Sequence, residues 1–491
     1  MVLIYTLPIF GISERTFPML FKRKDIDATQ GPILKNFILF ALPVAIGGII
    51  QTFFNAADMM VLGNMGTSLA VASVGATSTI IAFLVNTFIG LSGGTQVVLA
   101  HAYGEKNKNK INRTVNTALI MAAVIGIVLM AVGLLCADWF LHMTQCPKAC
   151  FAGASLYMRI YFIGVPAVLI YNFGAAIIRV SGDSQRPLYY LIASGALNVI
   201  LNIVLCLIME QKVAAVAIAT VASQVLGAVL VMYRLITIDN DCRFNIKHLS
   251  FDVKTFKKMM FVGIPCALNS SLYNISNLQI QSAINYHGYS ATAGNSASGN
   301  FEGIVGSFTN AVSTTALTFI GQNIGAKKPD RIKRTFFIGC ICGFVVGFVL
   351  GYGILLCGKP LLKLFVGNDV AAIECGYLRM KNLLSLYFVA ALSGVMGSTL
   401  QAFGYSIIPM LNSIFSVLIL RMVWMTFIYP NFKTLENLYF CYFVSWSLIF
   451  VIVAVVLSII FPRKLQKMRE SKRIEDALAE KNMLFIRKEE E

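Results

Sequence analysis

The stretch FILFALPVAIGGIIQTFFNAADMMVLG, residues 37 to 63, sets the fold class of the chain, because it is long and apolar yet contains a carboxylate. As an α-helix it would extend about 40 Å, enough to cross a bilayer with some tilt. Pro43, Gly47, Gln51, Asn55 and Asp58 recur at helical spacing and therefore share one face. A charged Asp facing hydrocarbon would cost about 3 kcal/mol. We therefore predict that this face meets protein or water and that Asp58 is a cation or proton site; a structural Asp, hydrogen-bonded to a neighbouring helix, is the alternative.

The composition is that of a polytopic membrane protein. Of 491 residues, 57% are hydrophobic and 13% are charged, which is too apolar for a soluble globular protein. The net charge of +17 would suggest nucleic acid in a soluble chain, but the distribution of the charges, given next, points to membrane loops and to no nucleic-acid partner. The 11 cysteines form no CxxC pair, and no His lies near them at ligand spacing, so we infer no metal site and no cofactor.

Long apolar windows predict twelve membrane spans, the first beginning near residue 36 and the last ending near residue 461. The tails and every second loop hold 31 Lys and Arg, whereas the alternate loops hold five. By the positive-inside rule both termini are cytoplasmic, in a plasma membrane or a bacterial inner membrane. Met19 is as plausible a start as Met1, because it directly precedes a basic cluster.

The two halves of the chain repeat each other at an offset of 220 to 222 residues. Pro43 matches Pro265, Gly104 matches Gly325, Arg113 matches Arg334, Arg159 matches Arg379, and Gly182 with Pro187 matches Gly404 with Pro409. Six spans in each half give the halves the same orientation, which predicts an all-α membrane protein of two six-helix bundles around a central cleft. The expected division is a tail at 1–35, a bundle at 36–235, a linker at 236–257, a second bundle at 258–461 and a tail at 462–491.

Five short patterns in this order resemble the multidrug and toxic compound extrusion (MATE) transporters, most closely the DinF-like branch. They are FNAADMMVLG at 54–63, the basic turn at 104–113, RVSGD at 179–183 with Pro187, GQNIGAKKPDRIKR at 321–334, and QAFG at 401–404 with Pro409. The resemblance implies an exporter, not an enzyme, that exchanges protons or sodium for amphipathic, often cationic small molecules. It also implies that Asp58 is the coupling residue in the N-terminal bundle. We expect a monomer.

One departure from the family concerns the fifth span. DinF-like proteins often carry an Asp in a pattern like N-x-x-x-D, whereas this chain reads Asn198-Val-Ile-Leu-Asn202. An Asn cannot exchange a proton in the physiological range, so Asp58 would lack a second carboxylate. The coupling mechanism that the resemblance implies is in doubt to that extent.

Other polar residues inside the predicted spans are candidates for a cavity or a second site. Glu302 lies in the eighth span, and Arg421 lies within the eleventh and needs a partner, for which Glu302 is the first choice. The pair is expected to be structural, and a transport role for Glu302 stays open. Five amides are candidates for lining the cavity of the N-terminal bundle, with interhelical hydrogen bonding as the alternative for each: Gln51, Asn55, Asn172, Asn198 and Asn202.

The energy source is expected to be an ion gradient, because no GxxxxGK[ST] phosphate loop is present. The nearest rival function is a flippase of lipid-linked saccharides with the same two-bundle plan, for which a cationic groove would be evidence. An integral membrane enzyme is a further alternative, although no nucleophile and base, paired acids or His cluster occur together. A channel fits a two-bundle repeat less well than alternating access does.

Overall fold

The computed structural model describes residues 26–144, 146–245 and 249–490, with the side chains of residues 55, 278 and 476–490 left out of the description. The described chain is helical. Its longer helices are α1 (Ile33–Met65), α2 (Ser68–Gly104), α3 (Lys108–Met143), α4 (Lys148–Val180), α5 (Gln185–Ile208), α6 (Lys212–Thr237), α7 (Val253–Tyr286), α8 (Tyr289–Gly325), α9 (Pro329–Leu356), α11 (Val370–Leu384), α12 (Tyr387–Ala402) and α16 (Leu435–Glu490). Short elements are α10 (Gly358–Val366), α13 (Ile407–Ser413), α14 (Leu420–Val423), α15 (Tyr429–Phe432) and the π-helical segments η4 (Ile414–Ile419) and η5 (Trp424–Ile428).

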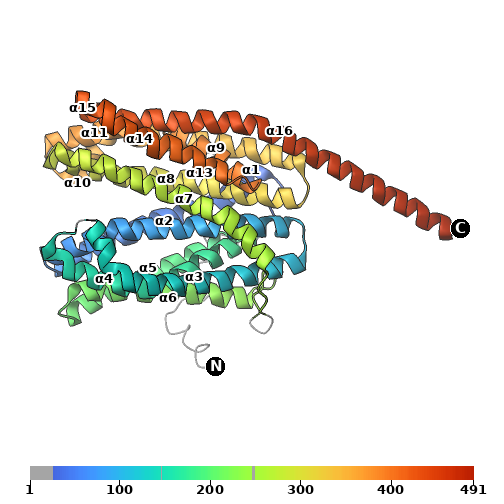
Figure 1. Ribbon diagram of the computed structural model, residues 1–491, viewed down its shortest axis with the longest axis horizontal. Helices are drawn as coiled ribbons and strands as arrows, with labels where there is room; N and C mark the ends of the chain where they lie inside the picture. The colour runs from blue at the N-terminus through green and yellow to red at the C-terminus, as the bar shows by residue number, and fades with distance from the viewer. Residues whose placement is uncertain (1–25, 145, 246–248, 491) are drawn as a thin grey trace.

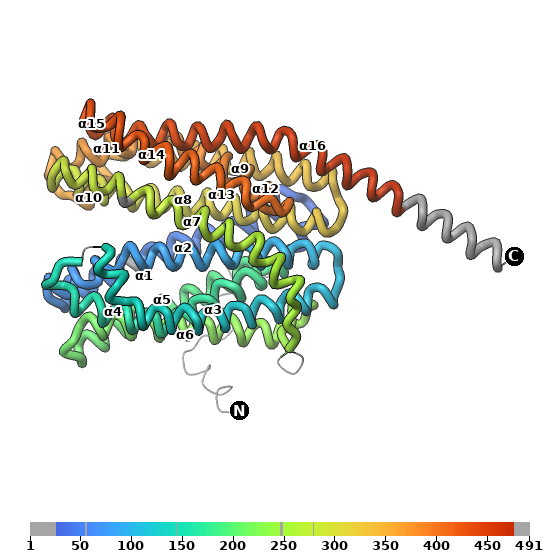
Figure 2. The backbone as a smooth tube through the Cα atoms, viewed as in Figure 1, coloured from blue at the N-terminus to red at the C-terminus, as the bar shows by residue number. Residues whose placement is uncertain are grey.

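The helices form two bundles that lie side by side, α1 to α6 in one and α7 to α16 in the other (Figures 1 and 2). We call them the N-terminal and the C-terminal bundle. The helix α2 packs along α7, and α1 packs along α8, so each bundle presents its first two helices to the other. Phe37 and Phe40 of α1 meet Phe319 of α8 edge to face, with ring centroids 5.7 and 5.4 Å apart. The two bundles are thus joined by an apolar seam.

The predicted fold class, an all-α membrane protein of about twelve spans, is confirmed. Among the described residues, ten helices are long and apolar enough to cross a membrane, and the count is eleven if α11 with α12, bent by 42°, is taken as one broken span. The helix α7 has 34 residues and occupies the position of the remaining predicted span. It is less apolar than the others because serines and asparagines such as Asn269, Ser270 and Asn277 occur along it, and these three line a cavity described below.

Side chains at the helix starts satisfy backbone N–H groups that have no partner within the helix. Thr67, Asn107, Asp252 and Asp369 accept hydrogen bonds from the third residue of the helix that follows them. Asp252 also accepts from the hydroxyl of Thr255, and this hydrogen bond holds the pKa of Asp252 below its usual value. These caps fix where α2, α3, α7 and α11 begin.

The repeat seen in the sequence also appears in the backbone. Lys106 and Lys327 have φ of 53° and 51°, and Gly182 and Gly404 have φ of 97° and 86°. A positive φ is unfavourable for a lysine, so the same strained turn at both positions shows that the two halves use one local design. These turns, with residues 238–245 and 249–252, lie at one end of the bundles, which we call the basic end.

At the basic end, α2 and α8 cross through a pair of equivalent glycines. A Cβ built on Gly104 would lie 1.9 Å from the carbonyl oxygen of Gln322, and one built on Gly325 would lie 2.0 Å from that of His101. Gly104 and Gly325 correspond in the repeat, as do His101 and Gln322. The contact is therefore reciprocal, as expected for two bundles related by an axis along the membrane normal.

Candidate functional site

Asp58 lies inside the N-terminal bundle, where α1, α5 and α6 meet. The side-chain amide of Asn202 on α5 donates a hydrogen bond to Asp58 Oδ1 at 2.5 Å. The hydroxyl of Thr220 on α6 donates to Asp58 Oδ2 over 3.5 Å. Both partners are neutral, so the carboxylate is held by dipoles and not by an opposite charge.

The amide of Asn202 is the centre of this cluster. It also donates to Asn198 Oδ1 at 3.2 Å, and the Asn202 side chain is fully buried. The oxygen Asn202 Oδ1 is buried and has no hydrogen-bond partner among the described residues. An acceptor without a partner beside a carboxylate can take a proton donor or coordinate a monovalent cation, which is the chemistry that a coupling ion needs.

The other predicted cavity residues of this bundle either form no hydrogen bond with Asp58 or have side chains outside the description. Gln51 is exposed, and Asn172 donates to the carbonyl of Val168 in its own helix at 2.8 Å. The side chain of Asn55 lies outside the described residues. Of the predicted residues, the structure thus brings together Asp58, Asn198 and Asn202. It also places Thr220 beside Asp58; in the sequence, Thr220 is distinguished only as a hydroxyl residue within an apolar span.

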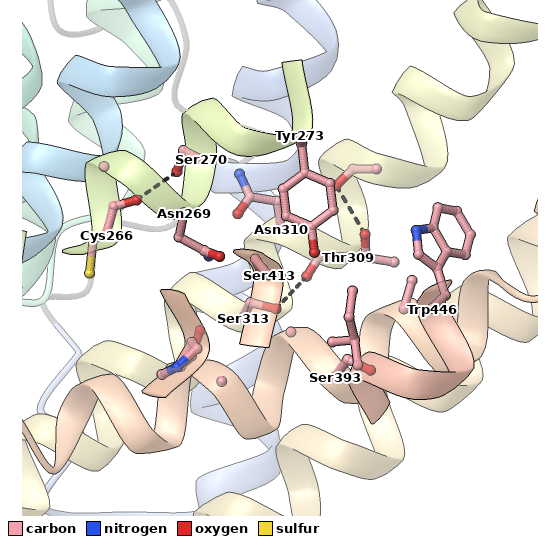
Figure 3. Close-up of a pocket in the computed structure, with 18 of the residues that line it drawn as sticks. Cys266, Asn269, Ser270, Tyr273, Thr309, Asn310, Ser313, Ser393, Ser413 and Trp446 are labelled. Carbon is pink, nitrogen blue, oxygen red and sulfur yellow. Dashed lines mark hydrogen bonds between the residues drawn. The ribbon is translucent and has the colours of Figure 1, made fainter. Parts of the chain in front are cut away.

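A cavity of about 500 Å³ lies in the C-terminal bundle (Figure 3). Its walls come from α7, α8, α11, α12, α16 and the interrupted span 407–432, and α2 of the N-terminal bundle contributes residues including Gly93 and Gln96. About half of the lining residues carry hydroxyl or amide groups, among them Asn269, Thr309 and Ser413. We call this the C-terminal cavity; Asp58 and its neighbours lie outside its lining.

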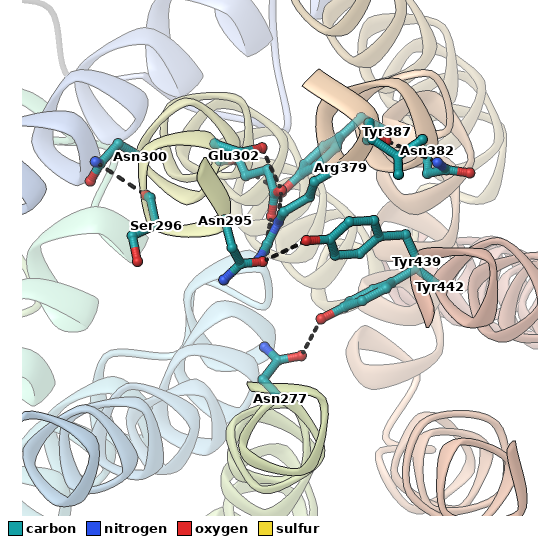
Figure 4. Close-up of polar contacts among 12 residues, drawn as sticks. Asn277, Asn295, Ser296, Asn300, Glu302, Arg379, Asn382, Tyr387, Tyr439 and Tyr442 are labelled. Atoms are coloured by element: carbon teal, nitrogen blue, oxygen red, sulfur yellow. Dashed lines mark hydrogen bonds and ion pairs between the residues drawn. The ribbon is translucent and has the colours of Figure 1, made fainter. Parts of the chain in front are cut away.

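Glu302 lines this cavity, but its partner is Arg379 of α11, and the prediction that it pairs with Arg421 was wrong (Figure 4). The pair is bidentate, with Arg379 Nε donating to Glu302 Oε1 at 2.6 Å and Nη2 donating to Oε2 at 2.7 Å. The third guanidinium nitrogen donates to Asn295 Oδ1. The prediction failed because helical periodicity gives the face on which Glu302 lies and not which helix covers that face. The repeat, which pairs Arg379 with Arg159, could have drawn attention to Arg379.

Arg421 lies across the same cavity, surrounded by neutral groups. Its guanidinium donates to Ser445 Oγ at 3.2 and 3.3 Å, to Asn277 Oδ1 at 3.1 Å and to Ser276 Oγ at 3.4 Å. The guanidinium carbon lies 4.2 Å from the ring centroid of Tyr442, a cation–π contact. The side chain is 1% exposed.

At the basic end, the segment 26–30 before α1 lies between the two bundles. The backbone N–H of Ile26 donates to the carbonyl of Gly182 at 3.1 Å, and that of Ala28 donates to Gln322 Oε1 at 3.2 Å. Gln322 in turn donates from Nε2 to the carbonyl of Val180 in α4 at 2.7 Å. One glutamine of α8 therefore contacts both the segment and the N-terminal bundle.

Further contacts tie the segment to the C-terminal bundle. Asn323 Nδ2 and Arg331 Nε both donate to the carbonyl of Ala28, at 3.1 and 2.9 Å, and Lys328 Nζ donates to that of Thr29 at 2.8 Å. Ala28 and Thr29 are buried. The basic end is closed in this conformation.

The family model for MatE matches residues 43–208 and 265–426, one match in each bundle. The chain belongs to the MatE family. Its members include transporters, and the double match agrees with the two-bundle repeat. The assignment to the DinF-like branch stays a prediction.

The chain is similar to curated MatE relatives over most of its length. It is 26% identical to the probable multidrug resistance protein YoeA of Bacillus subtilis, covering 78% of this chain and 84% of that protein. It is 23% identical to the FAD transporter of Shewanella oneidensis, over 70% and 77% of the two chains. The multidrug export protein MepA of Staphylococcus haemolyticus is 20% identical, over 86% and 91%.

Solved MatE structures share the fold. A MATE protein in complex with MaL6 superposes with a TM-score of 0.82 at 18% identity, covering 91% of this chain and all of that one. A MATE family transporter in an outward-facing conformation gives a TM-score of 0.80 at 16% identity, over 92% and 100% of the two chains. At these identities the likeness establishes the arrangement of the helices alone.

Proposed function

We propose that this chain is an ion-coupled exporter of amphipathic small molecules that works by alternating access of its two bundles. The observation that carries the proposal is the carboxylate of Asp58, held between three helices of a membrane bundle by the neutral donors Asn202 and Thr220. An intramembrane acid without a countercharge is costly, and a bound proton or monovalent cation removes that cost. The names of the curated relatives, multidrug resistance and export proteins, support the direction of transport.

Coupling follows from what the ion changes at Asp58. When Asp58 is charged, its two oxygens accept from α5 and α6. A proton or cation on the carboxylate weakens these hydrogen bonds, so the packing of α1 against α5 and α6 has a different free energy in the loaded and the empty state. Because a ligand shifts a conformational equilibrium by its differential affinity, ion binding at Asp58 can favour one orientation of the bundles.

Alternating access needs an interface that can open, and the basic end supplies it. The segment 26–30 and Gln322 connect the bundles there mainly through hydrogen bonds, which can be broken individually. The positive-inside rule makes the basic end cytoplasmic. The conformation described here would then be closed to the cytoplasm, in a plasma or inner membrane. Each chain contains both the coupling site and the cavity, so a monomer suffices.

The test is export in proteoliposomes with an imposed pH or sodium gradient. Asp58→Asn keeps the shape of the side chain, replaces one of its two acceptor oxygens by an N–H donor, and removes its charge and its titration. Gradient-driven accumulation should therefore fall to the level of protein-free liposomes, while substrate binding stays at the wild-type level. The matched control is Asp138→Asn, since Asp138 forms an exposed ion pair with Arg159 away from the cluster. An Asp58→Asn variant that still concentrates substrate against its gradient would remove Asp58 from the coupling site.

The rival function, a flippase of lipid-linked saccharides, is favoured by one feature, the two arginines in the C-terminal cavity. The resemblance to MATE transporters implied cationic substrates, and positively charged arginines in the cavity are unfavourable for a cation. The charge of the transported molecule is therefore argued separately below.

A further inference from the structure

Three charged side chains line the C-terminal cavity: Glu302, Arg379 and Arg421. Two of them neutralise each other, because Arg379 binds both oxygens of Glu302 in the bidentate geometry that suits a guanidinium and a carboxylate. The hydroxyl of Tyr387 donates to the backbone carbonyl of Glu302 at 3.1 Å, and Ser298 donates to its carboxylate at 3.4 Å, which holds this side of the cavity in place. The negative charge of Glu302 is thus neutralised by Arg379.

Arg421 has no such partner. Its hydrogen bonds go to two serine hydroxyls and one asparagine oxygen, and none of the carboxylates in the described residues forms an ion pair with it. Tyr442 packs against the guanidinium. Its hydroxyl donates a hydrogen bond to Asn277 Oδ1 at 3.2 Å (Figure 4). Since neutral acceptors and a ring face reduce the cost of the charge but do not cancel it, the charged lining of the cavity sums to one positive charge.

We propose that the C-terminal cavity binds an anionic group, a carboxylate or a phosphate, of the transported molecule, with Arg421 as its countercharge. This proposal rests on the function proposed above and specifies its substrate class. A positive charge without a counterion in a low-dielectric, membrane-embedded cavity attracts an anion strongly and repels a cation. Cationic compounds, which the resemblance implied, would meet this repulsion.

The size and the lining of the cavity fit a polar organic anion. Its volume of about 500 Å³ falls within the range of about 300 to 1,000 Å³ typical of small-molecule sites. Amides and hydroxyls such as Asn310, Ser313 and Ser393 can hydrogen-bond the uncharged part of the ligand, while Tyr273 and Trp446 offer aromatic surface (Figure 3). The anion is thus recognised by charge and the remainder by hydrogen bonds and stacking.

The backbone around Arg421 is an independent indication. Arg421 lies in the four-residue helix α14 between the π-helical segments η4 and η5. π-Helical turns are rare and occur frequently at functional sites, because each one costs regular hydrogen bonding and re-aims the side chains that follow. One such segment lies on each side of Arg421, the cavity arginine that has no acidic partner. This placement favours a role for its side chain beyond packing.

The first experiment compares ligands of opposite charge on the purified full-length protein. The probes are fluorescein, an anionic carboxylate dye, and rhodamine 6G, a cationic dye of the same ring system, with binding followed by fluorescence anisotropy in detergent without any gradient. We expect fluorescein to bind about tenfold or more tightly than rhodamine 6G, as for one charge-assisted contact. Equal or tighter binding of rhodamine 6G by the wild-type protein would overturn the proposal.

The second experiment removes the charge. Arg421→Gln should weaken fluorescein binding about tenfold, whereas Arg421→Lys, which keeps a cation, should retain the preference for the anion. The matched control is Arg159→Gln, which removes an exposed arginine outside the cavity. Unchanged fluorescein binding by a folded Arg421→Gln variant contradicts the proposal; should that variant not fold, the wild-type comparison and Arg421→Lys still decide.

A third arm separates a soluble anion from a lipid headgroup. If phosphatidylglycerol displaces fluorescein and phosphatidylcholine does not, the site is supported and its anion belongs to a lipid. If neither lipid displaces fluorescein, the site is supported and its anion belongs to a soluble ligand. All these measurements are made without transport. If anion binding depends on Arg421 but no export is found, the proposed exporter function is refuted and the anion site is kept. If export is found with a preference for cations, the exporter function is kept and the anion site is refuted.

Discussion

At the scale of single residues, the pair of Glu302 and Arg379 is the contact whose loss should be most costly. Both side chains are nearly buried, at 12% and 13% exposure, and each satisfies the other. Removing one partner of a buried pair typically costs about 3 to 5 kcal/mol, because the remaining charge is left without compensation. We therefore predict that Glu302→Gln lowers the midpoint of thermal unfolding in detergent, and that replacing both residues, Glu302→Leu with Arg379→Met, recovers part of the loss.

The control for this prediction is the exposed pair of Asp138 and Arg159, whose oxygen and nitrogen lie 2.8 Å apart. Surface ion pairs contribute about 0 to 1 kcal/mol, so Asp138→Asn should leave the midpoint almost unchanged despite the short distance. A Glu302→Gln protein that is as stable as wild type but does not export would place Glu302 in the transport mechanism.

At the scale of helices, the crossing of α2 and α8 depends on the absence of two side chains. A methyl group on Gly104 would overlap the carbonyl oxygen of Gln322, and backbone cannot rotate away as a side chain can. Overpacking of this kind costs about 1 to 3 kcal/mol. We predict that Gly104→Ala lowers the thermal midpoint, whereas Gly353→Ala, at a glycine of α9 that faces open space, does not. Equal midpoints for the two variants would mean that the helices can separate at the crossing without cost.

Whether the sequence predicts an element depends on whether that element is determined by local sequence or by packing between distant helices. Spans follow from the length of an apolar run, a local property, and each predicted span has a helical counterpart. The bend between α11 and α12, the short α10 and the segments η4 and η5 depend on packing between distant helices, and no local pattern predicts them. The same distinction applies to the sites: spacing placed Asp58 on a polar face, but only the fold brings Thr220 to it and pairs Glu302 with Arg379.

At the scale of the whole molecule, the two bundles are joined at the basic end by contacts that come from both. The segment 26–30 is hydrogen-bonded to Gly182 on one side and to Asn323 and Arg331 on the other. The ring nitrogen Nε2 of His101 in α2 also donates a hydrogen bond of 2.8 Å to the carbonyl oxygen of Ala402 at the end of α12. If the bundles alternate, the segment must lose its contacts with one of them in every cycle, and the direct contact between His101 and Ala402 must break. A covalent bridge between the two bundles at this contact must then stop transport.

The last prediction uses such a bridge. In a background without the 11 native cysteines, His101→Cys in α2 and Ala402→Cys in α12 place one thiol on each bundle, where His101 Nε2 now donates to the carbonyl of Ala402 at 2.8 Å. A bifunctional methanethiosulfonate reagent should abolish export in proteoliposomes, and reduction of its disulfides should restore it, because the bridge holds the basic end closed. The control is Lys359→Cys with Glu374→Cys, a salt-bridged pair within the C-terminal bundle whose separation need not change. Export that continues at the wild-type rate with the 101–402 bridge complete would mean that the basic end does not open during transport, and alternating access of the two bundles would have to be abandoned.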